Sequence, residues 1–145
     1  MKKIALLHYS YPPSMGGVEI LMQEQAHILT DLGYDVMVLT GSGHEGDHRI
    51  GFVVEEKLRS IMQQNPTLQK KIVTDGIMDE EFSLLASEMQ ETLEKTMADR
   101  DVIIVHNMTT LIHNLPFLSA FKEYVSSHPE KKILIWVHDQ TYINE

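Results

Sequence analysis

Three histidines stand directly after short apolar runs, where a side chain could meet a ligand. The runs and their histidines are Ile4–Leu7 before His8, Val102–Val105 before His106, and Lys132–Val137 before His138. Such runs are typical of buried parallel strands, whose carboxyl ends meet at the edge where open α/β sheets bind ligands. An imidazole there could donate a hydrogen bond to a ligand hydroxyl. One such histidine is more often satisfied by backbone carbonyls, but three at one edge favour a polar ligand cleft.

A pair of glycines, Gly16 and Gly17, follows the first of these runs and opens a helix. Glycine lets a ligand approach the backbone, and the first N–H groups of a helix have no partner within it. Together with the helix dipole, this arrangement favours an anion, most often a phosphate. The alternative, that the glycines only turn the chain after Pro12 and Pro13, stays open.

The elements that position these residues follow from the hydrophobic periodicity. A helical period over Val18–Leu32 has an apolar stripe with Gln25 as its only polar member. Gly33 then ends the helix, and Asp35–Leu39 is a second apolar strand, which makes a right-handed β-α-β unit with parallel strands.

The rest of the chain alternates in the same way. The expected elements are a short strand at Ile50–Val54, helices at Asp79–Met97 and Thr109–Val125, and strands at Val102–Val105 and Ile133–Val137. A kink is expected at Pro116, which removes a backbone donor. The fold class is therefore α/β, a Rossmann-like doubly wound, mainly parallel sheet with helices on both faces, in one domain over residues 1–145.

The composition excludes several classes of protein. A formal net charge of −9 argues against a nucleic-acid binder, and more weakly against strong attraction to anionic membranes. Without cysteine the chain has neither disulfides nor a thiolate nucleophile. No apolar run approaches the ~20 residues of a membrane helix, and the run after Lys3 is too short for a signal peptide. A cytoplasmic protein is the expectation.

The middle of the chain carries weak signals. In the polar loop Thr40–Arg49, the spacing of His44, Asp47 and His48 matches no zinc motif, so no metal site is expected. A helix is expected over Glu55–Gln64, ended by Pro66. The basic residues of this region are Lys57, Arg59, Lys70 and Lys71. They favour a solvated helix face, with weak contact to a membrane surface as the alternative.

Four segments together resemble the amino-terminal domain of GT-B fold glycosyltransferases, most closely retaining family 4, which uses nucleotide-sugar donors. They are HYSYPPSMGGVE after the first strand, LTDLGYDVMVLTG after the first helix, and DVIIVHN and ILIWVHD at the later strands. The residues that carry the match in the first two segments are Pro12, Pro13, Gly16, Gly17, Glu19, Leu29, Gly33, Val36 and Val38.

The resemblance implies transfer of a sugar from a nucleotide-diphosphate sugar, which is a co-substrate, with no further cofactor. It implies that His138 borders the reacting sugar as the catalytic residue and that Gly16 and Gly17 bind the donor phosphates. The residues that it assigns to acceptor or substrate binding are His8, Tyr11, Glu19, His106, Asn107 and Asp139. The acceptor, a sugar, lipid or small molecule, would lie on this domain.

The resemblance covers one half of such an enzyme. The second domain, which holds the nucleotide, has no counterpart in the chain, so we expect a truncated amino-terminal domain that is inactive alone. Two alternatives stay open: one subunit of a split glycosyltransferase, or a non-catalytic, flavodoxin-like binding or regulatory domain. A receiver domain would need acidic residues where His8-Tyr9-Ser10 stands, and a dinucleotide oxidoreductase would need Gly-x-Gly-x-x-Gly after the first strand.

Overall fold

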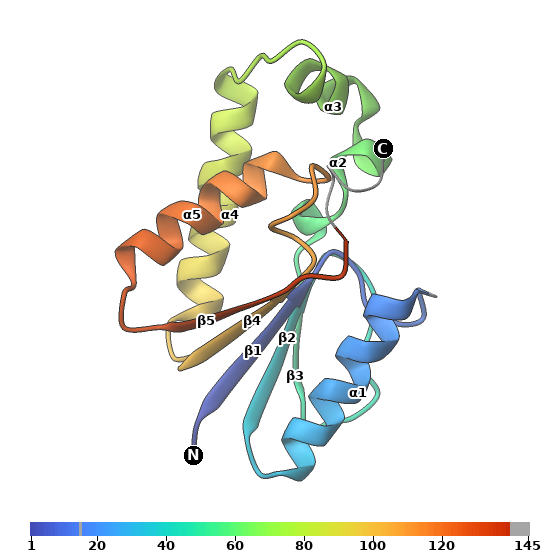
Figure 1. Ribbon diagram of the computed structural model, residues 1–145, viewed down its shortest axis with the longest axis vertical. Helices are drawn as coiled ribbons and strands as arrows, with labels where there is room; N and C mark the ends of the chain where they lie inside the picture. The colour runs from blue at the N-terminus through green and yellow to red at the C-terminus, as the bar shows by residue number, and fades with distance from the viewer. Residues whose placement is uncertain (15, 140–145) are drawn as a thin grey trace.

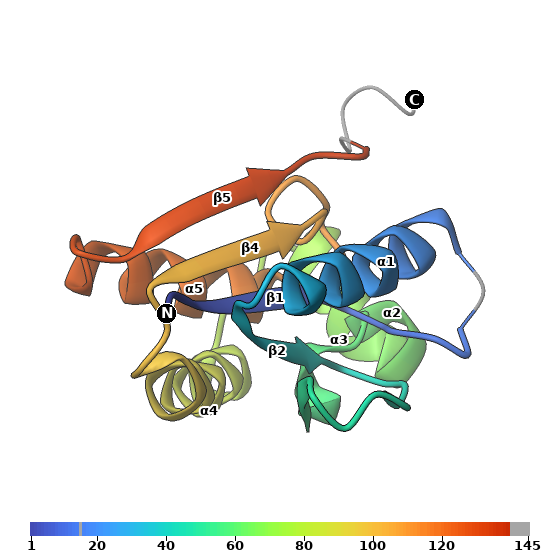
Figure 2. The ribbon, with the colours of Figure 1, turned by 90° about the horizontal axis from the view of Figure 1, so that it is seen from below.

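A computed structural model describes residues 1–14 and 16–139, and its centre is a five-stranded, all-parallel sheet (Figures 1 and 2). The strand order is β3-β2-β1-β4-β5. The strands are β1 (Lys3–His8), β2 (Asp35–Thr40), β3 (Gly51–Val54), β4 (Val102–His106) and β5 (Lys132–Trp136). Helices flank the sheet, and the predicted α/β, Rossmann-like doubly wound class is confirmed.

The central strand β1 pairs with β2 on one side and β4 on the other. In register, His8 lies opposite Thr40 of β2, and His106 lies opposite Trp136 of β5. Because all strands are parallel, their last residues share one edge of the sheet, as the sequence predicts.

Each face of the sheet has its own core. Helix α1 (Gly17–Asp31) covers one face, where Met22 and Ala26 pack on Leu6 and Val38. Helices α4 (Glu80–Met97) and α5 (Leu115–Ser127) cover the other (Figure 2). The buried residues of β1, β2 and β4 alternate between these two cores, as expected for strands with side chains on opposite faces.

The region between β3 and α4 forms short helices beyond the carboxyl edge of the sheet (Figure 1). They are a 3₁₀ helix η1 (Glu56–Leu58), α2 (Ile61–Gln64) and α3 (Pro66–Val73). The prediction of one helix over Glu55–Gln64 was therefore wrong in detail. Pro66 lies at the start of α3, and the Asn65 side chain accepts a hydrogen bond from the Leu68 N–H group at 3.0 Å.

The helix predicted over Thr109–Val125 begins only at Leu115. Asn114 is fully buried, and its side-chain oxygen caps the helix by accepting from the Phe117 N–H group at 3.0 Å. Pro116 falls in the first turn, where its missing N–H group costs no hydrogen bond, so the predicted kink is absent. Residues 107–114 form a loop that continues the carboxyl edge of β4.

Among the described residues, no helix is both long and apolar enough to cross a membrane.

Candidate functional site

The carboxyl edge of the sheet brings together the three histidines that follow apolar runs. His106 Nδ1 lies 3.3 Å from His138 Nε2, and the two rings stack with their centroids 5.6 Å apart. His8 Nδ1 lies 2.7 Å from the backbone oxygen of His106. The single tryptophan, Trp136, stacks on His106 from the neighbouring strand, with centroids 5.3 Å apart.

Gln25 of α1 holds the other ring nitrogen of His106. Its Oε1 atom lies 2.8 Å from His106 Nε2. The amide oxygen can only accept, so His106 donates from Nε2, and its Nδ1 then accepts from the His138 ring. Gln25 is the one polar residue of the predicted apolar stripe, and this contact explains its place there. The chain Gln25–His106–His138 fixes the imidazole at the end of the chain.

Burial keeps the imidazoles of His106 and His8 neutral. Desolvation, together with the nearby His138 and His8, lowers the pKa of His106 to about 4. Burial also lowers the pKa of His8, although its hydrogen bond with the His106 carbonyl and the charge of Glu19 oppose this. Near pH 7 both side chains therefore act as neutral hydrogen-bonding groups.

Asn107 directs the end of β5 towards the same site. Its backbone is left-handed, with φ of 56°, a conformation that asparagine tolerates better than most residues. Its side-chain oxygen accepts hydrogen bonds from the N–H groups of His138 at 3.0 Å and Asp139 at 2.8 Å. Asn107 thus fixes the position of the His138 backbone.

Glu19, in the first turn of α1, extends this network. Its carboxylate accepts from the Ser10 hydroxyl at 2.6 Å and lies 3.8 Å from His8 Nε2. It also covers Gly16, where an added Cβ would lie 2.1 Å from Glu19 Oε2. Space is open at Gly17, where an added Cβ would have no described side chain or non-neighbouring backbone within 4 Å. The start of α1 therefore carries a carboxylate beside Gly16 and an approach for a ligand beside Gly17.

A cavity of about 270 Å³, here called the polar cavity, lies against this network. Its main polar lining residues are His8, Ser10, Glu19, Arg59, Asn107 and Asp139. The predicted site residues that line it are His8, Glu19, Asn107 and Asp139. His106 and His138 do not line it, but each is hydrogen-bonded to a residue that does, His106 to His8 and His138 to Asn107. Gly16 and Gly17 lie outside its lining.

Tyr11, which was assigned to substrate binding, lies in the core and not in the cavity lining. Its ring is fully buried and packs edge-on against Phe52, and its hydroxyl donates to Glu45. Burial raises the pKa of Glu45, but the hydrogen bonds from Tyr11 and the N–H groups of Asp47 and Gly46 lower it by more. This pair anchors the loop Thr40–Arg49 to the sheet, which gives Tyr11 a structural role.

Three residues of the site were missed from the sequence. Gln25 could have been found from the sequence, because it is the one polar residue in an otherwise apolar helical stripe. Ser10 lies two residues beyond His8, in a loop whose path the sequence does not define. Arg59 is the one lysine or arginine among the described residues that line the polar cavity, and its Nε donates to the Gly41 oxygen at 3.0 Å. The sequence placed Arg59 on a solvated helix face and gave no sign that it lies near the histidines.

The loop histidines do not form a metal site in the part of the chain that the structure describes. No group of three or more His, Asp or Glu residues is arranged to hold an ion there. Asp47, which the loop places next to His48, pairs with Arg49 at 2.6 Å instead.

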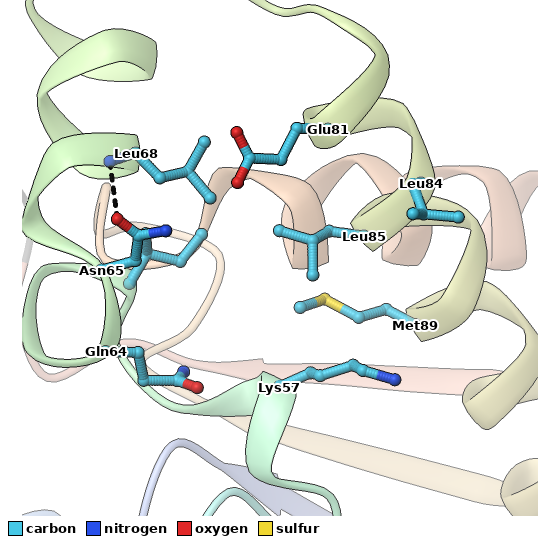
Figure 3. A pocket seen from close by; sticks show the side chains of 9 residues that line it. Lys57, Gln64, Asn65, Leu68, Glu81, Leu84, Leu85 and Met89 are labelled. Carbon is cyan, nitrogen blue, oxygen red and sulfur yellow. Dashed lines mark hydrogen bonds between the residues drawn. The ribbon is translucent and has the colours of Figure 1, made fainter.

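A second cavity, about 350 Å³ in volume, lies between α2, α3 and α4 (Figure 3). Apolar side chains, including Leu68, Leu85 and Met89, form most of its lining. Lys57 stands at one side and is paired with Glu88 at 3.1 Å. The cavity shares no lining residue with the polar cavity, so we treat it as a separate feature.

Comparison with protein-family models gives no match to this chain, and comparison with curated proteins gives no significant match either.

Proposed function

We propose that this chain is the acceptor-side half of a glycosyltransferase that uses a nucleotide-sugar donor. The observation that carries the proposal is the polar cavity at the carboxyl edge of the sheet, which is lined by the start of α1, by His8 and by Asn107. The resemblance to the amino-terminal domain of retaining GT-B enzymes supports the same conclusion. The donor-binding half belongs to a further domain or to a second subunit.

The lining of the polar cavity suits a sugar-like acceptor. Carboxylates of Glu19 and Asp139 can accept from hydroxyl groups, whereas Arg59 can donate to them. The neutral ring of His8, which lines the polar cavity, adds a further hydrogen-bonding group. A site built to pair hydroxyl groups discriminates strongly, because an analogue that lacks one leaves a buried polar group unpaired.

His138 is the residue that we place against the reacting sugar. One of its ring nitrogens is engaged with His106, and no partner of the other is found within the described residues. In the transfer, the acceptor oxygen bonds to the anomeric carbon, the bond to the nucleotide diphosphate breaks, and the acceptor proton leaves with the diphosphate. His138 holds a sugar hydroxyl by a hydrogen bond and orients it for this step.

The donor diphosphate would lie beside Gly17, where the backbone is open and the first N–H groups of α1 attract an anion. Glu19 lies in the same first turn as Gly17 and repels the diphosphate. Its hydrogen bond from the Ser10 hydroxyl and its closeness to His8 reduce that repulsion. Arg59, across the polar cavity, supplies a compensating positive charge.

A test of this proposal measures sugar binding and donor binding separately. Saturation-transfer difference spectra would be recorded with a panel of monosaccharides and disaccharides, and then with nucleotide sugars and FMN. We expect a sugar to bind and the nucleotides not to bind, because most donor contacts lie in the other half. We expect no transfer or hydrolysis by the chain alone.

Glu19→Gln should weaken the sugar found in this way about tenfold or more, as a charge-assisted hydrogen bond is worth about 1.5–3 kcal/mol. The matched control is Glu24→Gln, an exposed carboxylate on the same helix, which should leave binding unchanged. Tight binding of FMN without sugar binding would favour the flavodoxin-like alternative. Transfer by the chain alone would contradict the division into two halves.

A further inference from the structure

The polar cavity continues into a second hollow of about 530 Å³, here called the apolar groove. The residues that line both are Ser60, Gln63, Leu111 and His113. Beyond them the groove runs past Met62, Gln69 and Ile112. A molecule bound in the polar cavity therefore has a path along α2 and the loop 107–114.

The walls of the apolar groove are fastened to each other. The Ile61 N–H group of α2 donates to the His113 oxygen at 2.8 Å, and Gln69 Nε2 of α3 donates to the Ile112 oxygen at 3.0 Å. Buried Asn114 donates from Nδ2 to the Lys57 oxygen at 2.8 Å. Three elements are thus tied by backbone acceptors, so the groove is formed before any ligand binds.

The chemical character changes along this path. The polar cavity has carboxylates and a guanidinium, whereas the apolar groove has no Asp, Glu, Lys or Arg in its described lining. Met62 is 56% exposed there although it is apolar, and Leu111 and Ile112 are only partly buried. The amide of Gln69 is already used by Ile112. Covering such surface with an apolar chain removes it from water, which is favourable.

We infer that the acceptor is an amphiphile, with its polar head in the polar cavity and its apolar chain in the apolar groove. This inference rests on the proposed function, of which it names the acceptor class. The choice of occupant follows from continuity. The groove shares four lining residues with the polar cavity, so one molecule with a polar end and an apolar end can occupy both.

The cavity of Figure 3 is the competing place for an apolar chain. It shares no lining residue with the polar cavity or the apolar groove. Leu84, which is 59% exposed, lines it as Met62 lines the groove. The two positions therefore provide a matched pair for an experiment.

The experiment titrates the chain with methyl, hexyl and octyl β-D-glucopyranoside below their micelle concentrations. Binding is followed by NMR of ¹³C-methyl methionine. The Met62 signal is identified by its loss in Met62→Gln, an exposed change that leaves the core intact.

Complete burial of a methylene is worth about fourfold in affinity. An open groove should give about half of that free energy, or roughly twofold for each methylene. Hexyl to octyl should then gain about fourfold, with a shift of the Met62 signal. Met62→Gln should weaken octyl glucoside about threefold or more and leave methyl glucoside unchanged. Leu84→Gln should change neither.

An affinity that does not depend on chain length would overturn the inference, as would a dependence removed by Leu84→Gln and not by Met62→Gln. Sugar binding without chain-length dependence would leave the proposed function standing alone. A response of Met62 to the alkyl chain, together with failure of every sugar to bind at Glu19, would keep the groove as an apolar site and contradict the glycosyltransferase proposal.

Discussion

His106 is fully buried and contacts a polar group through both ring nitrogens. Such a residue could serve the core alone, but its partners argue for more. Gln25 comes from α1 and His138 from the end of β5, so one imidazole joins the helix of the glycine loop to the last strand. Disturbing it should affect the site and the fold together.

The pKa of His106 predicts a loss of stability in acid. Its pKa falls from an ordinary 6.5 to about 4 on folding, so between these values the unfolded chain binds the extra proton. The free energy of unfolding therefore decreases as the pH falls from 7 to 4.5, by about 2–3 kcal/mol from this residue. Urea unfolding at several pH values measures it.

In the His106→Asn variant, the free energy of unfolding should decrease less between pH 7 and 4.5 than in the wild type. This difference should hold whatever the stability of the variant at pH 7. The control is His44→Asn, which removes an exposed histidine from the polar loop and should leave the slope unchanged. An equal slope in wild type and His106→Asn would mean that folding does not change the pKa of the His106 imidazole.

Asn107 should stabilise the fold through the two hydrogen bonds that its side chain accepts from backbone N–H groups. Asn107→Ala loses both hydrogen bonds and places a residue with a Cβ in the left-handed region. We expect a loss of about 2–3 kcal/mol in urea unfolding. Asn107→Gly loses the same bonds without the backbone strain, so it should cost less. If alanine and glycine cost the same, the φ angle carries no strain.

Which site residues the sequence could predict depends on how directly the backbone places them. His8, His106 and His138 follow strands, and parallel strands must end at one edge. Tyr11 lies only three residues beyond His8, but the loop turns its ring into the core. Arg59 comes to the site through η1 and α2, whose positions depend on tertiary contacts and not on local periodicity.

At the scale of elements, the loop after β2 is packed against the loop after β1. Gly43 has φ of 113°, and an added Cβ would lie 2.5 Å from the Tyr11 oxygen. A strained backbone and a contact with fixed backbone atoms act together here. Gly43→Ala should therefore destabilise the protein by about 2 kcal/mol or more, measured by thermal and urea unfolding.

Gly46 provides the control in the same loop. Apart from its chain neighbours, no described residue lies within 4 Å of an added Cβ there. Gly46→Ala should change the free energy of unfolding by less than about 0.5 kcal/mol. A large effect at Gly46, or none at Gly43, would contradict the packing of the two loops.

Helix boundaries show where local patterns are ambiguous. The apolar spacing from Thr109 onward fits a helix, but the Asn114 cap and Pro116 in the first turn define the start at Leu115. The same pair of signals, Asn65 and Pro66, starts α3. Each proline could be read as ending a helix or as beginning one, and only the cap that precedes it decides.

At the scale of the molecule, the described residues leave part of the sheet uncovered at β5. Leu134 and Trp136 of β5 lie on the α1 face but are 42% and 43% exposed, since α1 packs over β1 and β2. The apolar pattern of β5 correctly predicted a strand. It also predicted burial, which within the described residues β5 does not reach, because burial depends on neighbours and not on the strand itself.

The order of strands in the sheet also determines which strands can pair while the chain is still being synthesised. Of the five strands of the sheet, the central strand β1 leaves the ribosome before the others, and it needs β4, nearly a hundred residues later, to complete its pairing. Residues 3–54 can form β1, α1, β2 and β3 early, with one edge of β1 open and one face bare until α4, β4 and α5 follow. At roughly 5–20 residues per second, that interval lasts several seconds. An open apolar edge attracts other strands, so the nascent chain is most prone to misassembly before β4 emerges.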